Sequence, residues 1–189
     1  MKLLVTVCIL LLGVQKAFCQ QLAAAGKRST IYIVRHGEKQ SGDDPDLTAE
    51  GKQRAGQLAS VLKNKKIRRI YVSEFKRTQQ TADSMRIQLG IDTVQYLADT
   101  SCTALFAAIT RNNDWNSSIL IVSHSNIMQK IIYKLGISDF PQANIPAAEF
   151  DNLYRVSQKK KQAVLLHQKY GQPSQPSASM QQATPATKQ

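Results

Sequence analysis

Short apolar runs alternate with longer stretches of helical periodicity along most of the chain. The runs that predict β-strands cover residues 30–34, 67–72, 93–96, 118–122, 152–157 and 162–168. The stretches whose apolar residues recur at helical spacing cover residues 47–62, 75–89, 104–110 and 127–135. Because strands and helices alternate up to the final pair of strands, the pattern predicts an α/β fold with a mainly parallel central sheet and helices on both faces.

The ends of the predicted elements carry ordinary start and stop residues. Thr48 is a suitable N-cap for the first helix, and Gly136 follows the last helix at the usual stop position. The last two strands form a predicted hairpin, and a single domain of residues 28–170 accommodates all of the elements. Residues 171–189 contain almost no large apolar side chains, so we expect a disordered tail there.

The N-terminus has the three-part pattern of a secretory signal peptide. Lys2 supplies a positive charge, residues 3–14 are apolar, and the chain then turns polar towards Cys19. We expect cleavage after Cys19, which places the mature protein in the periplasm or outside the cell. The apolar run is too short to span a bilayer. A lipid anchor on Cys19 is the alternative, and the bulky Phe18 before it disfavours that reading.

The charge of the mature chain favours anionic partners. Lys2 and Lys16 are the charged residues of the first 19, so the remainder carries 23 basic and 13 acidic residues, a net charge of +10. Nucleic acid, anionic lipid and phosphorylated molecules all fit such a charge. The basic cluster at residues 63–69 has no interleaved aromatic residues, so nucleic-acid binding is not expected. The mature chain would keep Cys102 alone, and its fold must rest on a hydrophobic core.

Three polar clusters directly follow predicted strands. Their chemically capable residues are Arg35, His36, Gly37 and Glu38 after the first strand, Ser73 and Arg77 after the second, and His124 and Ser125 after the strand at 118–122. Parallel α/β sheets place their ligand sites beyond the carboxyl ends of the strands. We therefore expect the three clusters to meet at one edge of the sheet.

These residue types suit a phosphate monoester. The guanidinium groups of Arg35 and Arg77 offer planar forks of donors to the peripheral phosphoryl oxygens. A neutral His36 has a ring-nitrogen lone pair that can attack phosphorus and form a phosphohistidine, which water then hydrolyses. His124 is better placed to donate to a non-bridging oxygen. Gly37 lets the backbone approach closely, and this chemistry requires no metal or other cofactor.

The combination resembles the histidine phosphatase superfamily, the phosphoglycerate mutase-like proteins, over residues 30–168. In that family an Arg-His-Gly motif follows the first strand, and the spacing from Ser73 through Arg77 to Thr81 is similar to its second motif. The resemblance implies that His36 is the nucleophile, that Arg35, Arg77 and His124 bind the phosphoryl group, and that Gly37, Glu38 and Ser125 contact substrate. The short chain is most similar to the small phosphohistidine phosphatases.

The proton donor for the leaving oxygen is the open point of the resemblance. The glycolytic mutases carry a glutamate acid in an inserted segment that this chain lacks. Asp99, in the loop after the strand at 93–96, lies where relatives place an acid, and Glu38 is the next candidate, although it can equally be a loop carboxylate that holds an arginine.

The resemblance implies a phosphoric monoester hydrolase of the histidine acid phosphatase type, and the N-terminal pattern predicts that it is exported. Its substrate would be a small phosphorylated molecule or a phosphoprotein. Two alternatives stay open: phosphoryl transfer of the phosphoglycerate-mutase type, and a catalytically silent phosphate-binding module. The sequence does not predict the oligomeric state.

Overall fold

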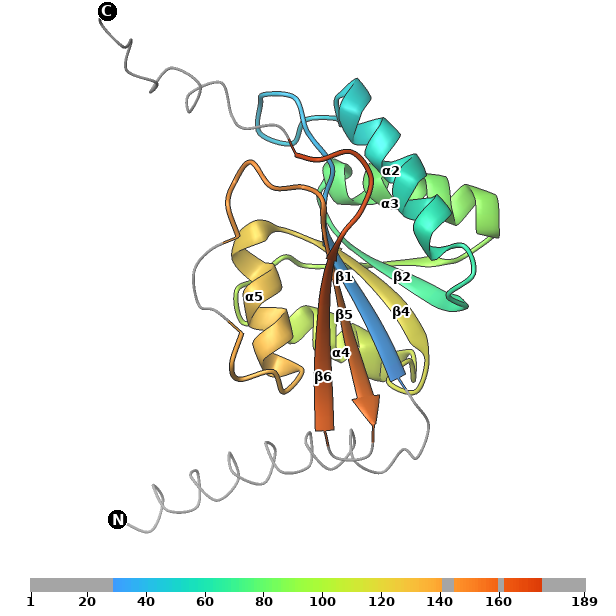
Figure 1. Cartoon of the computed structure of the whole chain (residues 1–189), viewed down its shortest axis with the longest axis vertical. Helices are drawn as coiled ribbons and strands as arrows, with labels where there is room; N and C mark the ends of the chain where they lie inside the picture. Colours follow the sequence, from blue (N-terminus) through green and yellow to red (C-terminus); the bar gives the residue numbers. More distant parts are fainter. Residues whose placement is uncertain (1–28, 141–144, 160–161, 175–189) are drawn as a thin grey trace, which may run out of the picture.

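The fold is described from a computed structural model of the chain, which describes residues 29–140, 145–159 and 162–174 (Figure 1). The predicted signal peptide with Cys19, the tip of the predicted hairpin at 160–161 and residues 175–189 of the predicted tail lie outside the described residues. Within them, none of the helices is both long enough and apolar enough to cross a membrane.

The predicted strands and helices are confirmed, with ends that shift by at most two residues. The strands are β1 (Ser29–Arg35), β2 (Ile67–Ser73), β3 (Thr93–Tyr96), β4 (Ser118–Ser123), β5 (Asn152–Lys159) and β6 (Gln162–Lys169). The helices are α2 (Ala49–Leu62), α3 (Lys76–Leu89), α4 (Thr103–Arg111) and α5 (Ser125–Lys134). Leu47, expected on the first helix, is buried just before the helix begins. The helix starts after Thr48, whose hydroxyl caps it by accepting a hydrogen bond from the Gly51 nitrogen at 3.2 Å.

The six strands form one sheet in the order β3-β2-β4-β1-β5-β6. Strands β1 to β4 pair in parallel, whereas β5 is antiparallel to both β1 and β6. Helices α2 and α3 pack on one face of the sheet and α4 and α5 on the other (Figure 1). The α/β class with a mainly parallel, doubly covered sheet is therefore as the sequence predicts.

Strand β1 shows why its sequence is apolar without interruption from Ile31 to Val34. Ile31 and Ile33 pack into the core under α4 and α5, whereas Tyr32 and Val34 pack into the core under α2 and α3. Both faces of a central strand are buried in such a sheet, so an uninterrupted apolar run replaces alternation. The strand thus fixes the position of Arg35 and of the residues that follow it.

The described chain continues beyond the expected end of the domain. Residues 171–174, assigned to the tail by composition, leave β6 and make hydrogen bonds to α2 and to the segment before β5. Polar contacts of Gln172 and Ser174 thus hold this segment, and composition alone does not reveal them. The ordered part reaches at least Ser174.

Candidate active site

The register of the sheet brings His36 and His124 together. Strands β1 and β4 are neighbours, with Arg35 opposite Ser123, and the His36 nitrogen donates to the Ser123 carbonyl at 3.0 Å. The next residue of each strand is therefore a histidine. The two imidazole rings lie 5.4 Å apart between centroids, and both residues are buried, with 3% and 7% of their surfaces exposed.

The backbone after β1 fixes the orientation of the His36 ring. Its Nδ1 lies 2.7 Å from the Gly37 carbonyl and donates to it in the neutral ring, which leaves the lone pair on Nε2. The Gly37 nitrogen in turn donates to the Thr81 hydroxyl at 2.8 Å. A side chain at Gly37 would approach the Gly51 carbonyl to 2.9 Å, so glycine is needed for this close packing against α2.

His124 is held from the other side by β2 and α3. Its Nε2 lies 2.9 Å from the Ser73 hydroxyl, which lies 3.0 Å from the Thr78 hydroxyl. Since Thr78 donates to the Phe75 carbonyl at 2.8 Å, a consistent chain of donors runs from His124 through Ser73 to Thr78. His124 Nδ1 is then an acceptor, and Arg77 Nη2 lies 3.5 Å from it.

Each of the two predicted arginines stacks on a phenylalanine. The Arg35 guanidinium carbon lies 4.1 Å from the ring centroid of Phe150, and that of Arg77 lies 4.2 Å from the centroid of Phe75. The same rings flank the histidines, with Phe150 at 5.9 Å from the His36 ring and Phe75 at 5.3 Å from the His124 ring. The aromatic faces orient the guanidinium groups and exclude water from the histidines.

The arginines keep donors available for an anion. Arg35 uses Nη1 to donate to the carbonyls of Ala147 at 2.6 Å and Glu149 at 3.3 Å, while Arg77 pairs with Asp44 at 3.5 Å. The Nε atoms of both arginines are buried and have no hydrogen-bond partner among the described residues. Buried donors without acceptors are costly, and a bound phosphoryl group would satisfy them.

Burial keeps the histidines neutral. Desolvation, opposed by the hydrogen bond to the Gly37 carbonyl and assisted by the Arg35 charge, lowers the pKa of His36 to about 3. Desolvation and the Arg77 and Arg35 charges lower the pKa of His124 to about 4. Desolvation also lowers the pKa of Arg35 to about 10, so this guanidinium remains charged at neutral pH. The site therefore combines neutral imidazoles with fixed positive charge.

We expect this neutrality to be visible in a pH titration followed by NMR. The chain has three histidines, so the ring signals are assigned by the variants His36→Ala and His124→Ala. In the free protein at pH 5 the signals of His36 and His124 keep their neutral positions, because their pKa values lie near 3 and 4. Titration of either ring near its ordinary value of about 6.5 would contradict the geometry.

The low pKa values of His36 and His124 also make the stability of the fold depend on pH. Below pH 6.5 the histidines of the unfolded chain bind protons, whereas the two rings of the folded site stay neutral. The contribution of these rings to the free energy of unfolding is therefore fully present above pH 6.5. It is lost as the pH falls towards 4 and 3.

The predicted site residues outside this cluster have other contacts. Glu38 accepts from Arg54 Nη2 at 2.6 Å and so takes the second role considered for it, a loop carboxylate that holds an arginine. Asp99 accepts from Ser101 and from the Thr103 and Ala104 nitrogens at 3.3 Å, at the start of α4. These hydrogen bonds lower the pKa of Asp99.

Ser125 is half-buried in the first turn of α5, directly after His124. Within the described ranges, no group of three or more His, Cys, Asp or Glu side chains is arranged to hold a metal ion.

Sequence reasoning missed Phe75, Phe150 and Arg54 as neighbours of the site. Phe75 is the N-cap residue of α3, two residues before Arg77, so its position in the second motif could have identified it. Phe150 and Arg54 come from segments distant along the chain, and no local pattern connects them with His36.

The middle of the chain matches a known family in sequence. Residues 31–101 match the model of the histidine phosphatase superfamily (branch 1). The probable phosphoglycerate mutase GpmB of Enterobacter sp. (strain 638) is 38% identical over 72 residues, and its counterpart in Escherichia coli O1:K1 / APEC is 36% identical over 72 residues. Each match covers 34% of this chain and 34% of the relative, so it spans about a third of the relatives' length.

Solved structures extend the likeness over most of the described chain. The protein histidine phosphatase SixA complexed with tungstate has a TM-score of 0.55 at 21% identity, covering 74% of this chain and 96% of that one. The alpha-ribazole phosphatase from Shigella flexneri has a TM-score of 0.55 at 18% identity, covering 72% and 94%. These likenesses establish the shared fold. The family match over residues 31–101, which includes the motifs around His36 and Arg77, supports membership of the histidine phosphatase superfamily.

Proposed function

We propose that the protein is a phosphatase that hydrolyses phosphate monoesters through a phosphohistidine on His36. The observation that carries the proposal is the fixed orientation of that ring. Its Nδ1 is tied to the Gly37 carbonyl at 2.7 Å, so the lone pair of a neutral ring lies on Nε2, beside two arginines and a second histidine. Such a nitrogen is a nucleophile that needs no deprotonation at neutral pH.

The first step forms one bond and breaks one. Nε2 of His36 attacks phosphorus, the bond from phosphorus to the ester oxygen breaks, and its electron pair leaves with that oxygen, which takes a proton from solvent. In the second step water attacks phosphorus, the phosphorus–nitrogen bond breaks and its electron pair returns to Nε2. Inorganic phosphate leaves, and the water contributes one proton to bulk solvent. In both steps the charge on the peripheral oxygens is met by Arg35 and Arg77.

His124 is suited to follow the charge of the substrate. Burial and the arginines lower its pKa to about 4, whereas a bound phosphoryl dianion favours protonation. Nε2 donates to Ser73, so the added proton would be carried by Nδ1, which lies beside Arg77. In that state His124 donates to a non-bridging oxygen together with Arg77.

The substrate and the location are part of the proposal. The net positive charge of the chain suits a small phosphorylated molecule or a phosphoprotein, and the N-terminal pattern supports action outside the cytoplasm, in the periplasm or after secretion. N-terminal sequencing of the mature protein tests the location, because cleavage after Cys19 leaves a chain that begins at Gln20. A lipid-modified Cys19 at the N-terminus would contradict simple cleavage.

Phosphoryl transfer within a substrate is the second candidate. The curated relatives, which match this chain over about a third of their length, are named as probable phosphoglycerate mutases. The two candidates differ in their product. A screen of aryl, sugar and glycerate phosphates, followed by phosphate release and by NMR of the products, separates them. We expect inorganic phosphate and the free alcohol. An isomeric phosphate ester would support the mutase, and phosphate binding without turnover of any ester would support a silent binding module.

Asp99 remains a predicted proton donor, and the structure gives it a competing role at the start of α4. Hydrogen bonds that stabilise the carboxylate oppose proton donation. We expect Asp99→Asn to change kcat for both aryl and alkyl phosphates by less than about threefold and to leave stability nearly unchanged, because asparagine keeps an acceptor oxygen for the nitrogens at the start of α4. A fall of about 100-fold for alkyl esters alone would instead establish Asp99 as the acid.

A further inference from the structure

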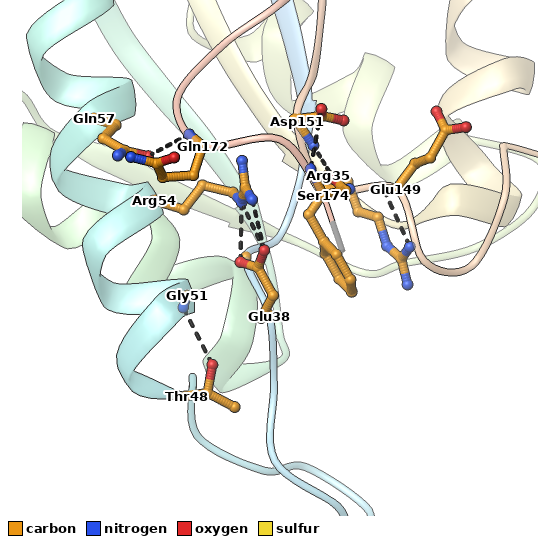
Figure 2. Close-up of polar contacts among 12 residues, drawn as sticks. Arg35, Glu38, Thr48, Gly51, Arg54, Gln57, Glu149, Asp151, Gln172 and Ser174 are labelled. Atoms are coloured by element: carbon orange, nitrogen blue, oxygen red, sulfur yellow. Dashed lines mark hydrogen bonds and ion pairs between the residues drawn. The ribbon is translucent and has the colours of Figure 1, made fainter. Parts of the chain in front are cut away.

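The chain after β6 turns back towards the site instead of leaving the domain. Gly171 has a φ of +68°, a left-handed conformation that favours glycine, and it redirects the backbone towards α2. We name residues 170–174 the C-terminal strap. Figure 2 shows Gln172 beside Gln57 of α2 and Ser174 beside Asp151, so the strap crosses between two elements that flank the loop after β1.

One end of the strap holds the Glu38 side of this loop. The Tyr170 carbonyl accepts from Arg54 Nη1 at 3.3 Å, and the Tyr170 ring lies below the Arg54 guanidinium at 5.8 Å. Arg54 donates to Glu38 through Nε and Nη2, at 2.9 Å and 2.6 Å. Arg54 and Tyr170 are each 3% exposed, so the ion pair is shielded from water on the strap side. Glu38 is two residues from His36 in the chain.

The other end of the strap holds the Arg35 side. The Ser174 hydroxyl accepts from the nitrogens of Phe150 at 2.8 Å and Asp151 at 3.2 Å. The Ser174 nitrogen donates back to an Asp151 carboxylate oxygen at 3.3 Å. Phe150 lies under the Arg35 guanidinium, and the Glu149 carbonyl before it accepts from Arg35 Nη1 at 3.3 Å. The position of Arg35 therefore depends on a segment that Ser174 fixes.

We propose that the C-terminal strap is a positioning element of the phosphoryl site, and that Ser174 positions Arg35 through the backbone of Phe150. The inference rests on the proposed function and deepens it, because residues that touch no reacting atom would fix the position of Arg35, the proposed anion-binding arginine. A displacement of about 1 Å at such a group is enough to slow a positioned reaction severely. The strap thus makes the site depend on the last described residues of the chain.

The test replaces the hydroxyl in the full-length protein. Ser174→Ala removes the acceptor for two backbone nitrogens, Ser174→Thr keeps it, and Ser60→Ala is the matched control, a hydroxyl on α2 that bonds a backbone carbonyl at 3.0 Å. Binding of inorganic phosphate is measured by calorimetry, and kcat and KM are measured with an aryl phosphate. Thermal unfolding identifies variants that fail to fold.

We expect Ser174→Ala to weaken phosphate binding and to lower kcat/KM by roughly 5- to 20-fold each, while Ser174→Thr and Ser60→Ala stay within about twofold of wild type. Wild-type values in Ser174→Ala would overturn the proposal, as would equal losses in the alanine and threonine variants. If the wild type binds phosphate but hydrolyses no ester, only the proposed function is contradicted. Weaker phosphate binding in Ser174→Ala would then still support the positioning role of the C-terminal strap. A wild type that binds no phosphate would overturn both.

Discussion

His36→Ala is expected to lower kcat for an aryl phosphate by at least about 10⁴-fold. Removal of a covalent nucleophile has effects of this size in enzymes that depend on one. In the proposed mechanism this residue contributes the ring nitrogen that forms the intermediate. His124 is not expected to replace it, because its Nε2 is engaged with Ser73 and its Nδ1 lies 3.5 Å from Arg77 Nη2. Phosphate binding should weaken much less, since both arginines remain.

His167→Ala is the matched control for this variant. His167 lies on β6, stacks on Tyr154 at 4.5 Å and contacts Asn152 at 2.8 Å, so its contacts are with β5. We expect its removal to leave kcat within about threefold of wild type. Activity in His36→Ala comparable to that of His167→Ala would exclude His36 as the nucleophile.

Arg77→Ala is expected to lower kcat/KM for the same substrate by about 10²- to 10³-fold, the usual cost of a lost donor to a charged transition state. Arg77 offers a planar fork beside His124, and its stacking on Phe75 fixes the plane of that fork. Arg77→Lys keeps the charge but loses the fork and the stacked geometry, so it should recover only part of the loss.

Arg86→Ala is the control on the same helix. Arg86 is near the end of α3 and pairs with Asp83 at 3.0 Å in an exposed i,i+3 contact, which contributes little to stability. Its replacement should leave both kcat/KM and phosphate binding unchanged within about twofold. A loss in Arg86→Ala equal to that in Arg77→Ala would indicate a general effect of charge, and would contradict a specific role for Arg77.

The hydrophobic pattern was sufficient for the architecture because the sheet buries both of its faces. Strands such as β4, with the sequence Ser-Ile-Leu-Ile-Val-Ser, have few alternatives to a central position, and Gly136 ends α5 with a φ of +95°. The edge of the sheet where ligands bind follows from the parallel order. For that reason the meeting of His36 and His124 could be expected from the sequence.

The details of the site depend on contacts that no local pattern encodes. Arg54 is one turn into an amphipathic helix, where an arginine is usually solvated, yet it is buried against Glu38. Phe150 lies more than 100 residues from Arg35 in sequence and still provides the face on which its guanidinium stacks. Composition also favours disorder from Gly171 onward, whereas hydrogen bonds from Gln172 and Ser174 hold the strap against the domain. These pairings join segments that are distant in the sequence and adjacent only in the folded domain.

The stacked arginines explain how the site can carry positive charge and still exclude water from the histidines. A guanidinium is weakly hydrated and stays charged when buried, so Arg35 and Arg77 can lie against phenylalanine rings without losing their charge. The same rings keep water from the imidazoles, and desolvation is the largest cause of the low pKa of His36. The neutral imidazole of His36 and the positive charge beside it therefore have a common structural origin.

The most direct test of the phosphohistidine is to trap it. The wild-type protein is mixed with a radiolabelled aryl phosphate, quenched in alkali, which preserves phosphohistidine, and digested for peptide mapping. We expect the label on the peptide that contains His36, as the isomer phosphorylated at Nε2, because Nδ1 is tied to the Gly37 carbonyl. Label on His124, or rapid turnover with no label on His36, would contradict the proposed mechanism.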